Sequence, residues 1–372
     1  MIQLNNSSDL GFLHAMKAYH AMMNISAIRC LNFFEVFDAI PNDRSIDITG
    51  ISKTTGASPD VLERLLNVVV AAGLIETDGR LQYKHTNISR GYRKGSPAAD
   101  TFNVMCDEGL ATACKLPEWF NAHGKSANPS AHDCAVNPWT WCNGIDGKSL
   151  FEVWPAYPER YKAFQHCLKA IETFRPYVGF YDFGSLSASR EPRERPLIVD
   201  IGGANGEFAQ AVINEYPNLE PKSIVVQDLY PSIKLAETNT ALSREVRLQV
   251  HDFFSPQPVQ HALAYHIRAC LHDYDDIQCV KILEQVVPAM ATDSKLLIAE
   301  YVMPDLPARG QNERCMDLLM MMFGGRERTL TQWGLLLEKT GLQMERVHYA
   351  SQKPWAIIEA VLKSDGVTLF RD

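Results

Sequence analysis

The sequence predicts an α/β protein in which a helical N-terminal domain precedes a Rossmann-like, doubly wound sheet. From residue 196 onward, short β-branched runs alternate with stretches of helical periodicity, as in parallel sheets covered by helices on both faces. Residues 9–98 instead repeat apolar residues at three- and four-residue spacing. A small-residue turn at 202–206 follows the first apolar strand of the second half and opens a helix.

Length and composition favour a soluble protein of more than one domain. The chain has 372 residues, of which 46% are hydrophobic and 22% charged, close to the globular average. The 36 Lys and Arg against 44 Asp and Glu give a net charge of -8, which disfavours binding to nucleic acid. No apolar run approaches the roughly 20 residues of a bilayer span, so we expect no membrane association.

Cysteine usage indicates a reducing environment. Nine cysteines are scattered from Cys30 to Cys315 without a C-x-x-C pair, which fits neither a disulfide framework nor a zinc ribbon. We therefore expect reduced thiols and a cytoplasmic location.

Residues 1–110 form the first expected domain. One long helix or two are predicted near the start, then a short helix, a turn at 56–59, a second helix and a two-stranded wing that turns at 78–79. This pattern resembles a winged helix-turn-helix. Because the second helix offers one Arg and no Lys to a phosphate backbone, we expect the apolar surfaces to form a homodimer interface instead.

Residues 111–183 are expected to form a helical connector that roofs the substrate pocket and ends in a helix from Pro158 onward. Its segment 121–144 is rich in small and polar residues and matches no motif, so it either shapes the pocket or loops over the surface. A polar break at 184–196 then opens the third expected domain, 184–372.

The third domain is expected to hold the sheet. The predicted strands are residues 197–201, 222–228, 247–253, 263–270, 295–302, 344–350 and 355–363. The last two follow one another without a clear helix between them, which predicts an antiparallel edge.

The turn after the first of these strands is suited to close approach of a ligand, because backbone amides and a helix N-terminus point at it. A dinucleotide fingerprint would need glycine at three positions that hold Gly202, Ala204 and Glu207. Nicotinamide binding is therefore disfavoured.

Acidic residues at the next two strand ends indicate an adenosine site. Asp228 can accept hydrogen bonds from both hydroxyls of a ribose, although an Asp that only caps the next helix is the alternative. Asp252 and Phe253 suit the amino group and the face of an adenine.

With these motifs and the H-D-Y run at 272–274, the chain resembles class I S-adenosylmethionine-dependent methyltransferases. More closely, it resembles plant and fungal small-molecule O-methyltransferases of the caffeic acid O-methyltransferase type, over most of its length. The resemblance implies S-adenosylmethionine as cofactor, held by Gly202, Gly203, Asp228, Asp252 and Phe253. Two positions depart from the family: Ala204 replaces a usual glycine, and Arg268, near the cofactor, replaces a usual lysine.

The same resemblance implies a general base. His272 matches the family's proton acceptor, and Glu300 and Glu327 match the carboxylates that orient it. A neutral imidazole can accept the proton of a phenol as the phenol oxygen attacks. The sulfonium of the cofactor is already activated, so the protein accelerates the reaction mainly by aligning the oxygen, the methyl carbon and the sulfur. No metal is required by this chemistry, and none is expected.

The acceptor is expected to be apolar and to contain a ring. By resemblance, Phe164 and Leu168 on the connector helix would hold it, and Met316 and Met320 would line its pocket, where thioethers pack adaptably against aromatic rings. The favoured function is thus O-methylation of a phenolic or enolic hydroxyl of a specialised metabolite.

Two other functions stay open. Some fungal proteins resembling this family bind S-adenosylmethionine yet catalyse pericyclic or dehydration steps, and a replaced His272 would have favoured that alternative. A winged-helix regulator that senses a metabolite is opposed by the acidic charge and by the complete set of base residues.

Overall fold

The computed structural model describes residues 7–78, 81–130, 137–145, 153, 156–188, 194–307, 314–351 and 354–363. The chain forms two compact units, one of Met1–Cys114 with Val153–Glu172 and one of Lys115–Glu152 with Thr173–Asp372. The segment expected to be a connector, 111–183, is thus divided between the two. In the described residues, no helix combines the length and the apolar character needed to cross a bilayer.

The first unit begins as the sequence predicts. Its elements are α1 (Ser7–Phe33), α2 (Val36–Ala39), β1 (Ile46–Asp47), α3 (Ile48–Thr55), α4 (Pro59–Ala71), β2 (Ile75–Thr77) and β3 (Gln82–His85). The helix-turn-helix and its wing are confirmed, and β1 adds an unpredicted strand to the wing, in the order β1-β3-β2. Gly79 of the predicted wing turn lies outside the described residues.

Local chemistry sets these boundaries. The Asp47 side chain accepts the N–H of Gly50 at 2.7 Å and so caps α3, which ends at Gly56 with φ of 74°. Pro59 occupies the first turn of α4, where its missing N–H costs nothing.

Helix α1 is apolar but mostly uncovered within its own unit. It packs against α4, and of its residues Ala27 and Leu31 are buried. Seven large apolar side chains of α1 are exposed: Leu10, Phe12, Leu13, Tyr19, Met22, Met23 and Phe33. Such a surface is typical of an interface rather than of a solvated helix.

The rest of the first unit is helical. It comprises a 3₁₀ turn at Ser89–Tyr92, α5 (Pro97–Val104), a π-helical turn at Met105–Leu110, α6 (Ala111–Ala113), α10 (Pro158–Ile171) and the start of a 3₁₀ turn at Glu172–Phe174. The predicted helix from Pro158 is confirmed. It packs against α5, and Arg160 binds the buried Glu108 carboxylate through two hydrogen bonds of 2.8 and 2.6 Å.

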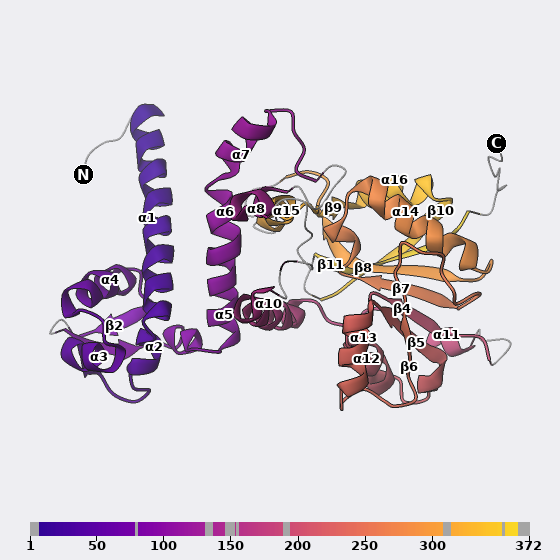
Figure 1. The fold of residues 1–372 in the computed structure, drawn as a ribbon, viewed down its shortest axis with the longest axis horizontal. Coiled ribbons are helices and arrows are strands. Elements are labelled where there is room, and N and C mark those ends of the chain that lie inside the picture. Colours follow the sequence, from indigo (N-terminus) through magenta and orange to yellow (C-terminus); the bar gives the residue numbers. More distant parts are fainter. Residues whose placement is uncertain are drawn as a thin grey trace. The chain divides into compact units, whose positions relative to one another are not determined.

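The second unit contains the predicted sheet (Figure 1). Its strands are β4 (Ile198–Ile201), β5 (Ile224–Asp228), β6 (Arg247–Val250), β7 (Ala264–Arg268), β8 (Lys295–Met303), β9 (Arg328–Thr329), β10 (Leu342–Tyr349) and β11 (Trp355–Leu362). The order is β10-β11-β8-β7-β4-β5-β6, with β9 pairing in parallel with the end of β8. The short strand β9 was not predicted from the sequence.

The predicted antiparallel edge is confirmed, with one detail added. Strand β11 runs antiparallel to both β8 and β10 and lies between them, so β10 forms the outermost position. The pairs β4–β5, β5–β6, β4–β7 and β7–β8 are parallel.

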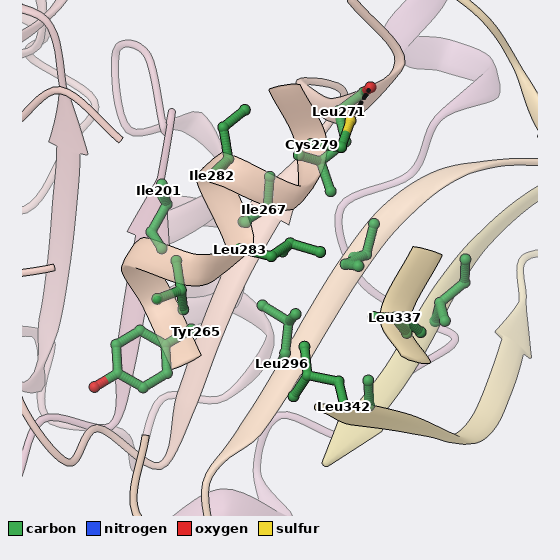
Figure 2. Close-up of a cluster of buried hydrophobic side chains, with 14 of the residues drawn as sticks. Ile201, Tyr265, Ile267, Leu271, Cys279, Ile282, Leu283, Leu296, Leu337 and Leu342 are labelled. Atoms are coloured by element: carbon green, nitrogen blue, oxygen red, sulfur yellow. Dashed lines mark hydrogen bonds between the residues drawn. The ribbon is translucent and has the colours of Figure 1, made fainter. Parts of the chain in front are cut away.

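Helices cover both faces of this sheet. Helices α14 (Asp276–Val286) and α16 (Leu330–Lys339) pack into one core cluster, and α12 (Glu207–Glu215) and α13 (Tyr230–Thr238) into the other. The remaining helices are α7 (Leu116–His123), α8 (Pro138–Asn143), α11 (Ser185–Ala188) and α15 (Arg314–Met322). In Figure 2, Leu271 lies in the first cluster with side chains of β7 and α14, which fixes the turn that follows β7.

Candidate active site

The predicted site residues of the second unit gather at the carboxyl edge of the parallel strands. Strands β5 and β7 lie on opposite sides of β4, so the order of strands reverses direction at β4. In doubly wound folds, such a reversal leaves a crevice at the carboxyl ends of the strands, where ligands bind. Asp228 ends β5, Arg268 ends β7, and Glu300 lies near the end of β8.

The turn after β7 is held by one buried carboxylate. Glu300 is fully buried, and its Oε1 accepts the backbone N–H groups of Cys270, Leu271 and His272 at 3.0, 2.9 and 3.3 Å. Three backbone donors that share one acceptor fix the conformation of the turn at 270–272. Burial raises the pKa of Glu300 above its ordinary range, while the positive charge of His272 opposes that rise.

The imidazole of His272 lies between carboxylates. Its Nδ1 is 3.0 Å from Oε1 of Glu327 and 3.7 Å from Oε2 of Glu300, and its Nε2 is 3.7 Å from Oδ1 of Asp273. Burial by itself lowers the pKa of His272, but the neighbouring carboxylates outweigh burial and raise that pKa to about 10. The neighbouring carboxylates therefore favour the protonated form of the ring.

Glu327 reaches this ring because the preceding segment packs directly on the His272 turn. The N–H of Arg326 donates to the carbonyl oxygen of His272 at 2.8 Å. A Cβ atom on Gly325 would lie 2.2 Å from the same oxygen, so this position admits no side chain. Asp317 on α15 accepts the N–H of Glu327 at 2.9 Å, which fixes the backbone of Glu327 itself.

Arg328 is a buried residue of the site that sequence reasoning missed. Its Nη1 and Nη2 donate to the carbonyl oxygens of Leu271 and Tyr274 at 2.9 and 2.8 Å, and its Nε donates to Asp276 at 2.9 Å. All three kinds of guanidinium nitrogen thus hold the segment that carries His272. Nothing in the local sequence distinguishes this arginine from its neighbours, because its partners lie more than 50 residues away.

The segment 121–144, left open by the sequence, contacts the same region of the second unit. Ser130 donates to the carbonyl oxygen of Gly325 at 2.6 Å, and the Asn137 amide donates to that of Phe323 at 3.1 Å. The Trp139 ring, fully buried, packs on Phe323 with centroids 5.9 Å apart. The described part of the segment therefore supports the loop that leads to Glu327; residues 131–136 lie outside it.

The predicted cofactor turn is crowded on the side where its glycines would carry side chains. A Cβ atom on Gly202 would lie 2.7 Å from Sγ of Cys270, and one on Gly203 would lie 2.3 Å from Oδ2 of Asp200. Ala204 has a φ of 48°, in the left-handed region that favours glycine, which explains why the resembling family has glycine there. The turn is therefore packed closely against Cys270 and Asp200.

Asp228 ends β5 as the sequence predicts, whereas β6 ends at Val250 and Asp252 follows it by two residues. Asp228 accepts the N–H of Ala204 at 2.9 Å through Oδ2 and that of Leu229 at 2.7 Å through Oδ1, which leaves further lone pairs for hydroxyl donors. Asp252 accepts the N–H of Phe254 at 3.0 Å. The ring of Phe253 comes within 3.8 Å of the position that a Cβ atom of Gly202 would occupy, so Phe253 lies against the turn after β4.

The remaining predicted residues are placed as follows. Arg268 donates from Nη2 to the carbonyl oxygen of Arg175 at 2.7 Å and lies over the Tyr177 ring at 4.2 Å. Met316 and Met320 are half-buried on α15 in the second unit, whereas Phe164, half-buried, and Leu168, exposed, are on α10 in the first unit. The role of these four side chains in binding an acceptor stays a prediction.

The residues around His272 also have the composition of a metal-binding site. His272, Glu300 and Glu327 offer one ligand atom each within 4.8 Å of one another, a set that could hold a metal ion. The expectation that no metal is required therefore stays a prediction.

The chain matches two family models and many relatives. Residues 181–343 match the O-methyltransferase domain, and residues 16–95 match the O-methyltransferase dimerisation domain. Methyltransferase pynC of Aspergillus niger is 30% identical over 352 residues, covering 92% of this chain and 95% of the relative. Demethylsterigmatocystin 6-O-methyltransferase of Aspergillus flavus is 32% identical over 323 residues, covering 87% and 81%.

Solved structures agree with this assignment. OxaC in complex with SAH and oxaline has a TM-score of 0.83 and 26% identity, covering 94% of this chain and 87% of that one. A pericyclic reaction enzyme has a TM-score of 0.79 at 24% identity, covering 97% and 90%, and shares the fold. This chain therefore belongs to the O-methyltransferase family, an enzyme family whose cofactor is S-adenosylmethionine.

Proposed function

We propose that the chain methylates a phenolic or enolic oxygen of a specialised metabolite, with His272 as the group that accepts the acceptor's proton. The observation that carries this proposal is the position of the His272 ring. Because Nδ1 faces Glu327 at 3.0 Å, the neutral ring carries its proton on Nδ1 and leaves the lone pair of Nε2 to accept another.

The chain's own residues hold and move the proton in this proposal. S-adenosylmethionine supplies, when bound, a methyl group on a positively charged sulfur. His272 takes the acceptor proton, and the carboxylates of Glu300 and Glu327 stabilise the imidazolium that results. The buried turn holds the ring in one orientation, so alignment is provided before the acceptor arrives.

The raised pKa of His272 limits how this base can work. With a pKa of about 10, the imidazolium is the prevailing form of His272 at neutral pH. A positive charge nearby would lower that pKa, since it disfavours a second cation. The base proposal therefore requires that the rate rise with pH, or that the bound sulfonium shift the proton equilibrium of His272.

We assign the cofactor roles as the sequence predicts. Gly202 and Gly203 would face the methionine end, Asp228 the ribose, Asp252 and Phe253 the adenine, with Arg268 nearby. The close-packed turn and the free lone pairs of Asp228 support this assignment. Met316 and Met320, on α15, would contact the acceptor.

The alternative function is a reaction that requires bound S-adenosylmethionine but transfers no methyl group. A pericyclase or dehydratase would bind S-adenosylmethionine and use its charge only. The shared fold of a pericyclic reaction enzyme keeps this alternative open, whereas His272 with both carboxylates in contact range favours methyl transfer.

We also propose that the chain is a homodimer through its first unit. The dimerisation-domain match and the exposed apolar side chains of α1 support this. Burial of such side chains on association is the main favourable contribution to a stable interface.

The dimer is tested by Phe12→Glu, which places a charge on a side chain that is 69% exposed on α1. We expect the wild-type protein to sediment at the mass of two chains and the variant to dissociate into single chains. Leu306→Glu, on an 80% exposed leucine of the second unit, is the matched control and should stay dimeric. Wild-type protein that sediments as one chain would refute the proposal.

The base is tested by His272→Ala across pH 7–10. Wild-type kcat/KM for a phenolic acceptor should rise with pH as the imidazolium loses its proton. The variant should lose about 100-fold or more near pH 10, the range expected for a general base, and less towards pH 7, yet bind SAH within a few-fold of wild type.

A matched control for His272→Ala is His348→Ala. His348 lies on β10, and its Nε2 is 2.7 Å from the buried carboxylate of Glu359, so it too is a histidine paired with a buried acid. This control should keep its pH profile. Assays in EDTA separate the base from a metal at the same side chains: activity lost on chelation would contradict the metal-free base. Equal loss of SAH affinity and rate in His272→Ala would also count against it.

The ribose role is tested by Asp228→Ala and Asp228→Asn. We expect the alanine variant to bind SAH about 10- to 100-fold more weakly by calorimetry, since a charged hydrogen bond is removed. The asparagine variant keeps an oxygen for the N–H of Ala204 but not the charge, so it separates loosening of the turn from loss of the ribose contact. Unchanged dissociation constants in both variants would remove Asp228 from the cofactor site.

A further inference from the structure

Arg175 is a buried cation that neither the sequence nor the proposed mechanism uses. It follows the 3₁₀ turn at Glu172–Phe174 and belongs to the second unit, where it is 5% exposed. Its guanidinium lies over the rings of Tyr301 and Trp355, at 4.6 and 5.3 Å from their centroids. These aromatic faces stabilise a cation, and Tyr301 also forms a side-chain hydrogen bond with Arg175.

The polar contacts of Arg175 are incomplete. Its Nε is buried and has no hydrogen-bond partner, and within the described residues no carboxylate comes within ion-pair distance of it. Buried polar groups are ordinarily hydrogen-bonded, because an unmet donor loses its water without replacement. An unmet guanidinium donor therefore points to a partner that the chain itself does not supply.

Arg328 shows what a purely structural arginine looks like in the same region. It is fully buried, and Nε, Nη1 and Nη2 all donate to fixed partners within the chain. Arg175 lies at the same edge of the sheet with its Nε unmet. The difference indicates a ligand-binding role for Arg175.

The surroundings of Arg175 also favour an anion. Arg268, whose Nη2 donates to the Arg175 carbonyl oxygen, lies 5.1 Å from the same Trp355 ring. Two guanidinium groups thus share one indole, and an anion bound beside them would reduce their mutual repulsion. Burial lowers the pKa of Arg175, but Tyr301, Glu327 and Glu300 together raise it, so the side chain stays charged.

We propose that Arg175 binds an anionic oxygen group of a ligand, either a carboxylate or an ionised enol, at the carboxyl edge of the sheet. Two sources have this chemistry: the methionine carboxylate of the cofactor and an acidic acceptor. The proposal uses the family's cofactor but not the base role of His272, so it holds or fails independently of methyl transfer. An acidic acceptor would arrive already ionised and would need no base.

The test uses pairs of probes that differ in the anionic group, titrated into the full-length protein at pH 7. The first pair is SAH and 5′-methylthioadenosine, which lacks the amino-acid moiety. The second pair is 4-hydroxycoumarin, an acidic enol, and 4-methoxycoumarin, its neutral ether, each added with saturating SAH. We expect wild type to prefer the anionic member of at least one pair by tenfold or more.

The variants assign that preference to Arg175. Arg175→Met should abolish it, and Arg175→Lys, which keeps the charge without the planar donor fork, should retain part of it. Arg195→Met is the matched control, because Arg195 is also largely buried but binds Asp293 at 2.6 Å, away from the carboxyl edge, and its loss should leave both preferences unchanged.

The outcomes separate the sources. Loss confined to the first pair assigns Arg175 to the cofactor carboxylate, and loss confined to the second assigns it to an acidic acceptor. The proposal is overturned if wild type shows no preference in either pair or if the preference survives in Arg175→Met. If Arg175→Met does not fold, an undiminished preference in Arg175→Lys, with affinities equal to wild type, overturns it as well.

Discussion

The hydrogen bonds from the 270–272 turn to the Glu300 carboxylate are the interaction on which the site depends. Oε1 of Glu300 takes three backbone N–H groups that would otherwise be left without partners at the end of β7. Leu271 anchors the same turn in the core, where the Cys279 thiol also contacts its carbonyl oxygen at 3.2 Å (Figure 2). His272 thus projects from a turn that is fixed on both sides.

This arrangement determines the charge of the site as well as its geometry. The carboxylate that holds the turn also lies 3.7 Å from Nδ1 of His272, so the same residue that positions the ring raises its pKa. A phenol of ordinary acidity requires that proton to leave first. An enol that is already ionised could instead be held by cations at the sheet edge, Arg175 among them, and this links the acidity of the acceptor to the route of the reaction.

Features that depend on local sequence were predicted well. The strand end at Asp228, the helix-turn-helix around Gly56 and the helix from Pro158 follow from periodicity and turn chemistry, whereas β6 ends at Val250, before Asp252. His272, Glu300 and Glu327 were identified only through resemblance, because the contacts that join them cross 28 to 55 residues. Their roles stay proposals.

Features that depend on distant contacts were missed. Strand β9 is two residues long and exists because it pairs with the end of β8. Arg328 and Arg175 are ordinary arginines in the sequence, and only their burial distinguishes them. The segment 121–144 has no motif, yet Ser130 meets Gly325 across 195 residues.

The most direct test of the central claim is product analysis with trideuteromethyl-labelled S-adenosylmethionine and a panel of phenolic and enolic metabolites. We expect a product whose oxygen carries the labelled methyl group, with SAH formed in equal amount. A rearranged or dehydrated product without label, formed while the cofactor is unchanged, would contradict methyl transfer and assign the chain to the alternative reaction.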